Sequence, residues 1–144
     1  MLKVIPIYAT LLALFFVYLS ARTIGVRRKA KISIGDGGDS EMLRAMRMHA
    51  NFSEYTPITL LLLALLELQG GNFWVLHCLG ILIVAARLSH AYGISSAQAP
   101  GKFRVAGMVG TFTTIVIAAV ILLTKSVVSI YKSHAYSNFI IPMT

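Results

Sequence analysis

A group of charged and hydrogen-bonding side chains, whose types and spacing suit ligand binding, precedes an apolar run that ends at Leu68. They offer two guanidinium groups, an amide, a carboxylate and a phenol: Arg44, Arg47, Asn51, Glu54 and Tyr55. At about 100° per residue, these side chains fall within an arc of roughly 100° on one helix. Guanidinium groups bind carboxylates, a carboxylate binds an ammonium group, and amide and phenol groups hydrogen-bond to peptides. Because ionisable groups at the mouth of a membrane helix must face protein, water or a ligand, the pattern predicts a site for a small zwitterionic ligand.

Further cationic or titratable groups lie near the ends of the other apolar runs: Arg22, Arg87, His90 and Arg104. All four runs thereby bring a basic group to the same predicted membrane face. Arginines at helix ends also extend toward lipid headgroups, and this alternative stays open for Arg104. Glu54 is the only acid of the cluster within the predicted bundle. The excess of positive charge therefore favours an anionic ligand.

The composition is typical of a membrane protein. The 144 residues are 57% hydrophobic and only 12% charged, which lies outside the range of ordinary soluble domains. A helix needs about 20 mainly apolar residues to cross a hydrocarbon core of ~30 Å. We expect helices over about 4–22, 40–68, 73–92 and 104–131. No long apolar–polar alternation suggests a barrel, so we predict an all-α integral membrane protein, a single-domain bundle of four transmembrane helices.

The 13 lysines and arginines are distributed unevenly around these helices. Most of them lie between the first two helices, at 22–47, or between the last two, at 87–104, whereas the remainder are Lys3, Lys125 and Lys132. By the positive-inside rule, we predict that both termini lie outside and that the predicted site faces the cytoplasm. The first run is too long for a signal peptide and lacks a cleavage pattern, so we expect it to be retained. The net charge of +8 is explained by topology and anionic lipid, so nucleic-acid binding is not expected.

The sequence does not predict a metal site. Cys78 is the single cysteine, which excludes an internal disulfide and a multi-thiolate centre. The four histidines show no pair with metal-ligand spacing on one helix. We interpret Cys78 as a packing residue.

The motif Arg47-x-His49-x-Asn51-x-x-Glu54-Tyr55-x-Pro57 resembles the signature of the MAPEG family, the membrane-associated proteins in eicosanoid and glutathione metabolism. The resemblance extends over all four predicted helices, through Ser20-Ala21-Arg22, Ala86-Arg87-x-x-His90 and Phe103-Arg104-Val105. Two further segments are most similar to the bacterial YecN-like branch of that family, Gly35-Asp36-Gly37-Gly38 and His90-Ala91-Tyr92-Gly93.

The resemblance implies a homotrimer that binds glutathione as a co-substrate at subunit interfaces, toward the cytoplasmic side. By motif position, the implied glutathione-binding residues are Arg22, Arg47, Asn51, Glu54, Tyr55, Arg87 and His90. Arg104 matches an arginine that stabilises the glutathione thiolate in related synthases. The resemblance therefore implies that Arg104 is the catalytic residue. A free thiol has a pKa of about 8.5, and a nearby guanidinium group favours its nucleophilic, ionised form. We expect the ligand to lie between Arg22 and 47–55 of one chain and 87–104 of the next.

Two departures from the family argue against eicosanoid specificity: Thr23 follows Arg22, and Val105 follows Arg104. We therefore predict a membrane-bound glutathione transferase or peroxidase that acts on lipophilic electrophiles or lipid hydroperoxides. Its expected partners are the homotrimer, membrane lipid, glutathione and a lipophilic small-molecule substrate. The alternative is a catalytically silent membrane trimer that binds glutathione, lipid or a protein partner. Formation of a thiolate on glutathione binding would separate the two.

Overall fold

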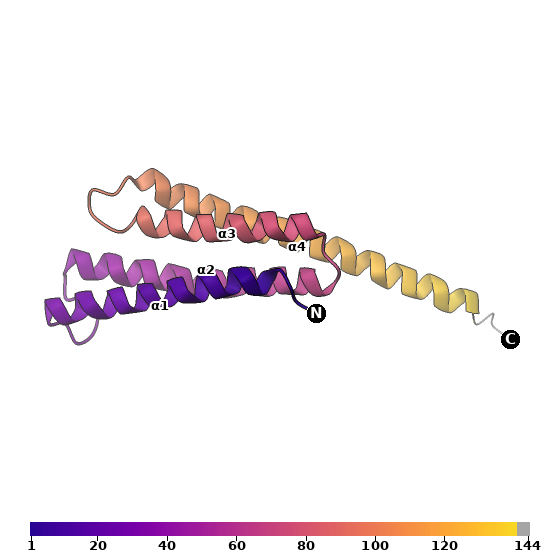
Figure 1. The fold of residues 1–144 in the computed structure, drawn as a ribbon, viewed down its shortest axis with the longest axis horizontal. Coiled ribbons are helices and arrows are strands. Elements are labelled where there is room, and N and C mark those ends of the chain that lie inside the picture. Colours follow the sequence, from indigo (N-terminus) through magenta and orange to yellow (C-terminus); the bar gives the residue numbers. More distant parts are fainter. Residues whose placement is uncertain (141–144) are drawn as a thin grey trace.

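Four helices form the part of the chain that the structure describes. The computed structural model describes residues 1–140, with side chains described through Ala135. The helices are α1 (Ile5–Ala30), α2 (Ser40–Leu68), α3 (Phe73–Tyr92) and α4 (Gly101–Ile140). The α1–α2 and α3–α4 connections lie at one end of the bundle, and the N-terminus and the α2–α3 turn lie at the other (Figure 1). The described part of the chain is thus the expected all-α bundle.

The bounds of α2 and α3 are those expected, whereas α1 and α4 are longer. The first helix continues past Arg22 to Ala30, where three cations in its last turn interact favourably with the helix dipole. Lys31 caps the end of the helix, and its φ of 54° is left-handed. With 40 residues, α4 is about 60 Å long, roughly twice the hydrocarbon thickness. Its second half projects beyond the other helices on the side of the N-terminus (Figure 1).

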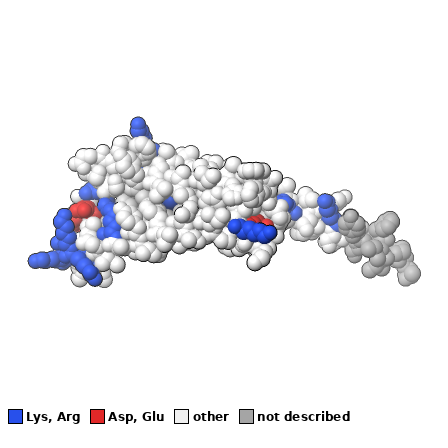
Figure 2. All heavy atoms as spheres, in the orientation of Figure 1, with Lys and Arg blue, Asp and Glu red and all other residues white. Residues whose placement is uncertain are grey.

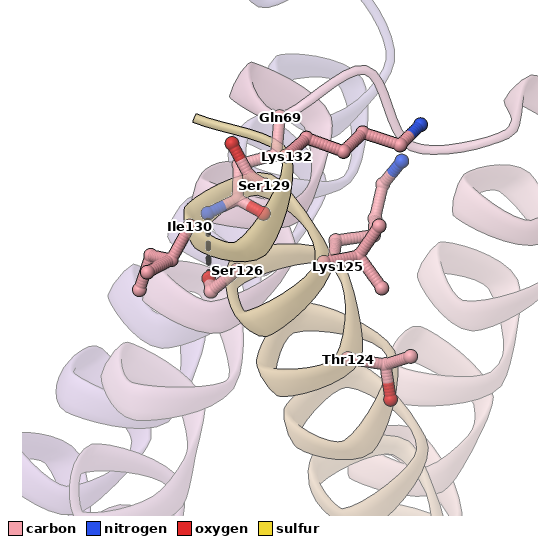
Figure 3. A pocket seen from close by; sticks show the side chains of 8 residues that line it. Gln69, Thr124, Lys125, Ser126, Ser129, Ile130 and Lys132 are labelled. Atoms are coloured by element: carbon pink, nitrogen blue, oxygen red, sulfur yellow. Dashed lines mark hydrogen bonds between the residues drawn. The ribbon is translucent and has the colours of Figure 1, made fainter. Parts of the chain in front are cut away.

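The projecting part of α4 is tied to the bundle where it leaves the other helices. The Gln69 side chain, just after α2, donates a 3.0 Å hydrogen bond to the Ser126 hydroxyl (Figure 3). A hollow of about 690 Å³ surrounds this contact, with Lys125 and Lys132 among its lining residues. Both lysines line this hollow together with Gln69, and the α2–α3 turn that begins with Gln69 lies at the end of the bundle opposite the α1–α2 and α3–α4 connections (Figure 1).

Side chains cap the starts of three helices, and Asn72 does so for α3 by accepting hydrogen bonds from the amides of Trp74 and Val75. Asp39 accepts a 2.7 Å hydrogen bond from the Met42 amide and so fixes where α2 begins. At the other end of the bundle, the Glu67 carboxylate accepts hydrogen bonds from three backbone amides, at residues 3–5, where α1 begins. The capping places the start of α1 beside the end of α2, because one carboxylate satisfies three otherwise unpaired amides.

Three of the four helices are long and apolar enough to cross a membrane by length and composition: Ile5–Ala30, Phe73–Tyr92 and Gly101–Ala135. The second helix is long enough but is too polar in its first half, which carries Glu41, Arg44, Arg47 and Glu54. Figure 2 shows charged side chains gathered toward the two ends of the visible face, with an almost uncharged band between them. This distribution suits a bundle whose middle lies in hydrocarbon.

Small residues bring α3 and α4 into close contact. A Cβ atom on Gly107 would lie 2.5 Å from the His90 amide nitrogen and 2.6 Å from the Ala86 carbonyl oxygen. A Cβ on Gly93 would collide with the backbone nitrogen of Arg104. The two helices can approach this closely only because both positions lack a side chain. The contact fixes His90 and Arg104 relative to one another.

Candidate functional site

A cavity of about 400 Å³ opens at the end of the bundle where the α1–α2 and α3–α4 connections lie. We call it the arginine cavity. Its lining comes from the start of α2, the connection before α4 and the start of α4: Leu43, Arg44, Arg47, Gly93, Ile94, Ser96, Ala97, Ala99, Gly101 and Arg104. Three guanidinium groups from two helices meet there, and none of the described residues that line the cavity carries a carboxylate. The volume is in the range of small-molecule sites, and the charge favours an anion.

Local structure positions the three arginines. The Asp39 cap sets the register of α2, which places Arg44 and Arg47 one turn apart. The Ser89 hydroxyl donates a 2.9 Å hydrogen bond to the Phe103 carbonyl and holds the start of α4 against α3. The buried Nε of Arg44 has no hydrogen-bond partner among the described residues. An oxygen atom of a bound anion would satisfy this donor.

Arg87 lies deeper in the bundle, with only 1% of its surface exposed. Its guanidinium group donates to the Thr111 hydroxyl at 3.1 Å and to the side-chain oxygen of Asn51. The group also lies 5.7 Å from the centre of the Phe52 ring. No carboxylate pairs with Arg87 in the described part of the chain, and its Nε has no partner. The buried charge is held by neutral groups alone, so it is left without a counter-ion.

Arg22 lines a separate cavity of about 320 Å³ between α1 and α3. Its Nη2 donates a 3.0 Å hydrogen bond to the carbonyl of Ser95, whereas its buried Nη1 has no partner among the described residues. The other lining residues are mainly apolar: Phe15, Tyr18, Met48, Leu88, Ala91 and Tyr92. Arg22 therefore connects α1 to the same connecting segment, 93–99, that lines the arginine cavity.

The structure divides the predicted arc on α2 into two edges. Arg44, Asn51 and Tyr55 are partly buried, and the Tyr55 ring packs edge-on against Phe112 at 5.5 Å. Arg47 and Glu54 are exposed on the outer edge. Glu54 forms no ion pair within the described residues.

His90 is 4% exposed and packs against the backbone of α4 at Gly107. Its Nδ1 is buried and has no hydrogen-bond partner among the described residues. His90 precedes the lining residues Gly93 and Ile94 in the sequence, but its own side chain does not line the arginine cavity. In the described part of the chain, no three His, Cys, Asp or Glu side chains gather as metal ligands.

The predicted residues are thus only partly brought together within one chain. The arginine cavity joins Arg47 to Arg104, and a hydrogen bond joins Asn51 to Arg87. That bond lies within a single chain, whereas we expected its two residues on opposite sides of a subunit interface. The remaining predicted residues lie apart from the arginine cavity: Arg22, Glu54, Tyr55 and His90.

Two contributions to the site were absent from the predicted set. Thr111 binds Arg87, and its position about two turns after Arg104 was a usable signal. The segment 93–99 contributes to the walls of both cavities. Its small residues carry no pattern from which that role could be inferred.

The chain is similar to known membrane proteins. A sequence model described as the MAPEG family matches residues 5–123. Curated relatives include "Inner membrane protein YecN" from Escherichia coli strain K12, which is 39% identical over 87 residues. The protein of the same name from Escherichia coli O6:H1 has the same identity over the same length. The match covers 60% of this chain and 66% of each relative, just under two thirds.

Proposed function

Because the chain belongs to the MAPEG family, we propose that it binds glutathione in the arginine cavity and acts as a membrane-bound glutathione transferase or peroxidase. The substrates in this proposal are lipophilic electrophiles or lipid hydroperoxides. The observation that carries it is the meeting of Arg44, Arg47 and Arg104 around a cavity to which the described residues contribute no carboxylate. Such a cavity attracts a ligand with more than one negative charge.

The chemistry of glutathione suits this surface. The tripeptide has two carboxylates, and an arginine forms strong, often paired hydrogen bonds with a carboxylate. In our assignment, Arg44 and Arg47 on α2 hold a carboxylate and Arg104 on α4 lies near the sulfur. A guanidinium group beside the thiol lowers its pKa and raises the fraction of nucleophilic thiolate. Transfer to an electrophile, or attack on a hydroperoxide, then starts from the thiolate.

We propose that the complete site forms in a homotrimer. Glu54 is exposed on α2, at a depth where a carboxylate facing lipid is costly. Apolar side chains continue the same exposed stripe toward the end of α2: Ile58, Leu61, Leu65 and Leu68. A neighbouring subunit covering this stripe would remove Glu54 from lipid and add a carboxylate for the ammonium group of glutathione. We place the trimer in an inner membrane, with both termini periplasmic and the arginine cavity cytoplasmic.

Calorimetric titration of the purified protein with glutathione tests the proposal, together with ultraviolet absorbance of the thiolate. Arg47→Ala should weaken binding by about 1.5–3 kcal/mol, the range for hydrogen bonds to charged groups. Arg104→Ala should retain much of the affinity but lose the thiolate absorbance and turnover. Lys102→Ala is the matched control, because Lys102 is a neighbouring cation that does not line the cavity.

Absence of glutathione binding to the wild-type protein would refute the proposal. Binding without a thiolate signal, and without turnover of electrophiles or hydroperoxides, would instead support the catalytically silent trimer. Retention of full thiolate formation in Arg104→Ala would reassign that role to Arg22 or Arg87.

A further inference from the structure

Polar and cationic side chains line the hollow of about 690 Å³ at the point where α4 leaves the bundle. We call it the lysine hollow. Its polar lining comes from α4 and from the residue that follows α2: Gln69, Thr124, Lys125, Ser126, Ser129 and Lys132. It shares no lining residue with the arginine cavity, which opens at the other end of the bundle. The lysine hollow is therefore separate from the proposed glutathione site.

The two lysines continue the face of α4 that packs against the bundle. Thr111, Ala118, Lys125 and Lys132 follow one another at intervals of seven residues, or about two helical turns, and so lie along one side of the helix. Thr111 and Ala118 are fully buried, whereas the lysines come where the other helices end. Figure 3 shows the ammonium groups of both lysines on the same side of α4. The inward face of α4 thus changes from buried and uncharged to cationic at the end of the bundle.

The chain supplies no carboxylate to neutralise these cations from α3 or α4, because the sequence contains no Asp or Glu after Glu67. Glu67 itself accepts hydrogen bonds from the backbone amides at the start of α1. Neither Lys125 nor Lys132 forms an ion pair within the described residues. Two like charges that line one hollow repel each other, and an anion between them removes the repulsion. The lysine hollow therefore favours an anionic occupant.

The position of the hollow along α4 corresponds to the headgroup layer of a membrane. Lys125 lies about 32 Å along the helix from Arg104, close to the thickness of the hydrocarbon core, and Lys132 lies about 10 Å further out. At the start of α3, Phe73 and Trp74 are 54% and 72% exposed. Exposed aromatic rings are typical of the boundary between membrane and water. The anion that is available at this depth is a lipid phosphate.

We propose that the lysine hollow binds the phosphate of an anionic phospholipid headgroup. The ammonium groups of Lys125 and Lys132 contact the phosphate oxygens, and the Ser129 hydroxyl donates a hydrogen bond to one of them. The hydrogen bond from Gln69 to Ser126 holds the end of α2 against α4 and so closes one side of the hollow. Phosphatidylcholine also has a phosphate, but its choline cation is repelled by the lysines. The hollow therefore selects phosphatidylglycerol over phosphatidylcholine.

Fluorescence of the only tryptophan in the chain, Trp74, tests this selection locally, because α3 begins at the same end of the bundle. The full chain is reconstituted in phosphatidylcholine vesicles that contain a small fraction of brominated phosphatidylglycerol or, in parallel, of brominated phosphatidylcholine. Bromine on the acyl chain quenches tryptophan only at short range. We expect the wild type to concentrate phosphatidylglycerol near Trp74 about 25-fold over phosphatidylcholine, which is about fivefold for each lysine.

Substitutions of the lysines separate the hollow from the general positive charge of the protein. Lys125→Gln and Lys132→Gln should each lower the enrichment about fivefold, and the double variant should abolish it. Lys125→Arg combined with Lys132→Arg should keep it, because both cations remain. Arg28→Gln combined with Lys29→Gln is the matched control. It removes two exposed cations from the other end of the bundle and should leave the quenching of Trp74 unchanged.

Equal quenching of the wild type by the two brominated lipids would overturn the proposal, as would an enrichment that persists when both lysines are glutamine. An equal loss of enrichment in the control variant would show general attraction to a basic protein and would also overturn it. Inorganic phosphate should lower the enrichment no more than sodium chloride of the same ionic strength. A stronger effect of phosphate would show that free phosphate occupies the hollow and would exclude the lipid. All these measurements omit glutathione, so their failure leaves the proposed glutathione site untouched.

Discussion

Arg87 is a buried cation whose presence the stability of the fold alone does not explain. Its guanidinium group is buried, is held by the neutral side chains of Asn51 and Thr111, and has no carboxylate partner in the described residues. Desolvation of an unpaired charge is costly, and apolar replacements of buried charged groups are often neutral or stabilising. A cation retained under these conditions is best explained by a bound anion. The second carboxylate of glutathione would supply one.

We expect Arg87→Met to separate stability from binding. Without ligand, the variant should be as stable as the wild type or more stable by about 1–2 kcal/mol, because methionine fills similar space without a charge. Glutathione affinity should fall by at least about tenfold. Denaturant titration in mixed micelles and calorimetry measure the two quantities. Arg28→Met, which removes an exposed cation, should change neither. A large loss of stability in ligand-free Arg87→Met would instead assign Arg87 a structural role.

Among the helices, the contact between α3 and α4 governs the geometry of the arginine cavity. Gly107 lets α4 lie against the backbone of Ala86 and His90, and Gly93 lets the connection between the helices lie against Arg104. Association of membrane helices depends on such close packing, because lipid tails are as apolar as the helix surfaces. A single methyl group added at this contact should therefore change the geometry of the arginine cavity.

Gly107→Ala should destabilise the protein by about 1–3 kcal/mol, the usual cost of overpacking a tight contact. The methyl group can be accommodated only by separating α3 from α4, so glutathione affinity should fall with stability. Gly25→Ala is the matched control, since nothing lies within 4 Å of a Cβ there. It should be neutral or stabilising by up to about 1 kcal/mol, because alanine is a better helix former. Thermal unfolding in detergent compares the two. If the two substitutions had equal effects on stability, α3 and α4 would be able to separate at little cost, which would contradict the prediction.

Across the whole molecule, charge and length define two unlike ends. Basic side chains are concentrated at the end that carries the α1–α2 and α3–α4 connections, whereas α4 projects from the other end (Figures 1 and 2). At the projecting end, Glu67 is occupied by the backbone amides at the start of α1. By the positive-inside rule, we therefore propose that the arginine cavity faces the cytoplasm and that the projecting helix lies outside.

A reporter fused after Thr144 tests this orientation. Alkaline phosphatase should be active in that position, and a cytoplasmic fluorescent reporter should not, because only the periplasm supports the former. The reverse result would move the arginine cavity to the periplasm.

Assembly is tested by mass in detergent. We expect three times the 15.7 kDa of one chain, because the exposed stripe that contains Glu54 needs cover. Glu54→Leu should preserve the trimer while weakening glutathione binding, since leucine extends the apolar stripe but removes the carboxylate. A stable monomer that still binds glutathione would contradict a shared site.

Much of the architecture follows from local properties of the sequence. The apolar runs, the Asp39 cap and the glycine-rich turns place α2 and α3 where they are observed, because helix ends depend on a few neighbouring residues. The motif around Arg47 and Asn51 likewise indicated the family that the matched sequence model shows. The extension of α1 beyond Arg22 was missed, because the cations that end it resemble a membrane boundary as much as a helix end.

Tertiary structure alone decided how the predicted residues are grouped. Sequence periodicity placed Arg47, Asn51 and Glu54 on one arc, but the packing of α3 and α4 buries one edge of that arc and exposes the other. It also pairs Asn51 with Arg87 in the same chain and places Arg22 in a cavity of its own. Helix rotation and separation depend on contacts between residues far apart in the chain, such as Gly107 with His90. Periodicity along a single helix carries no information about those contacts.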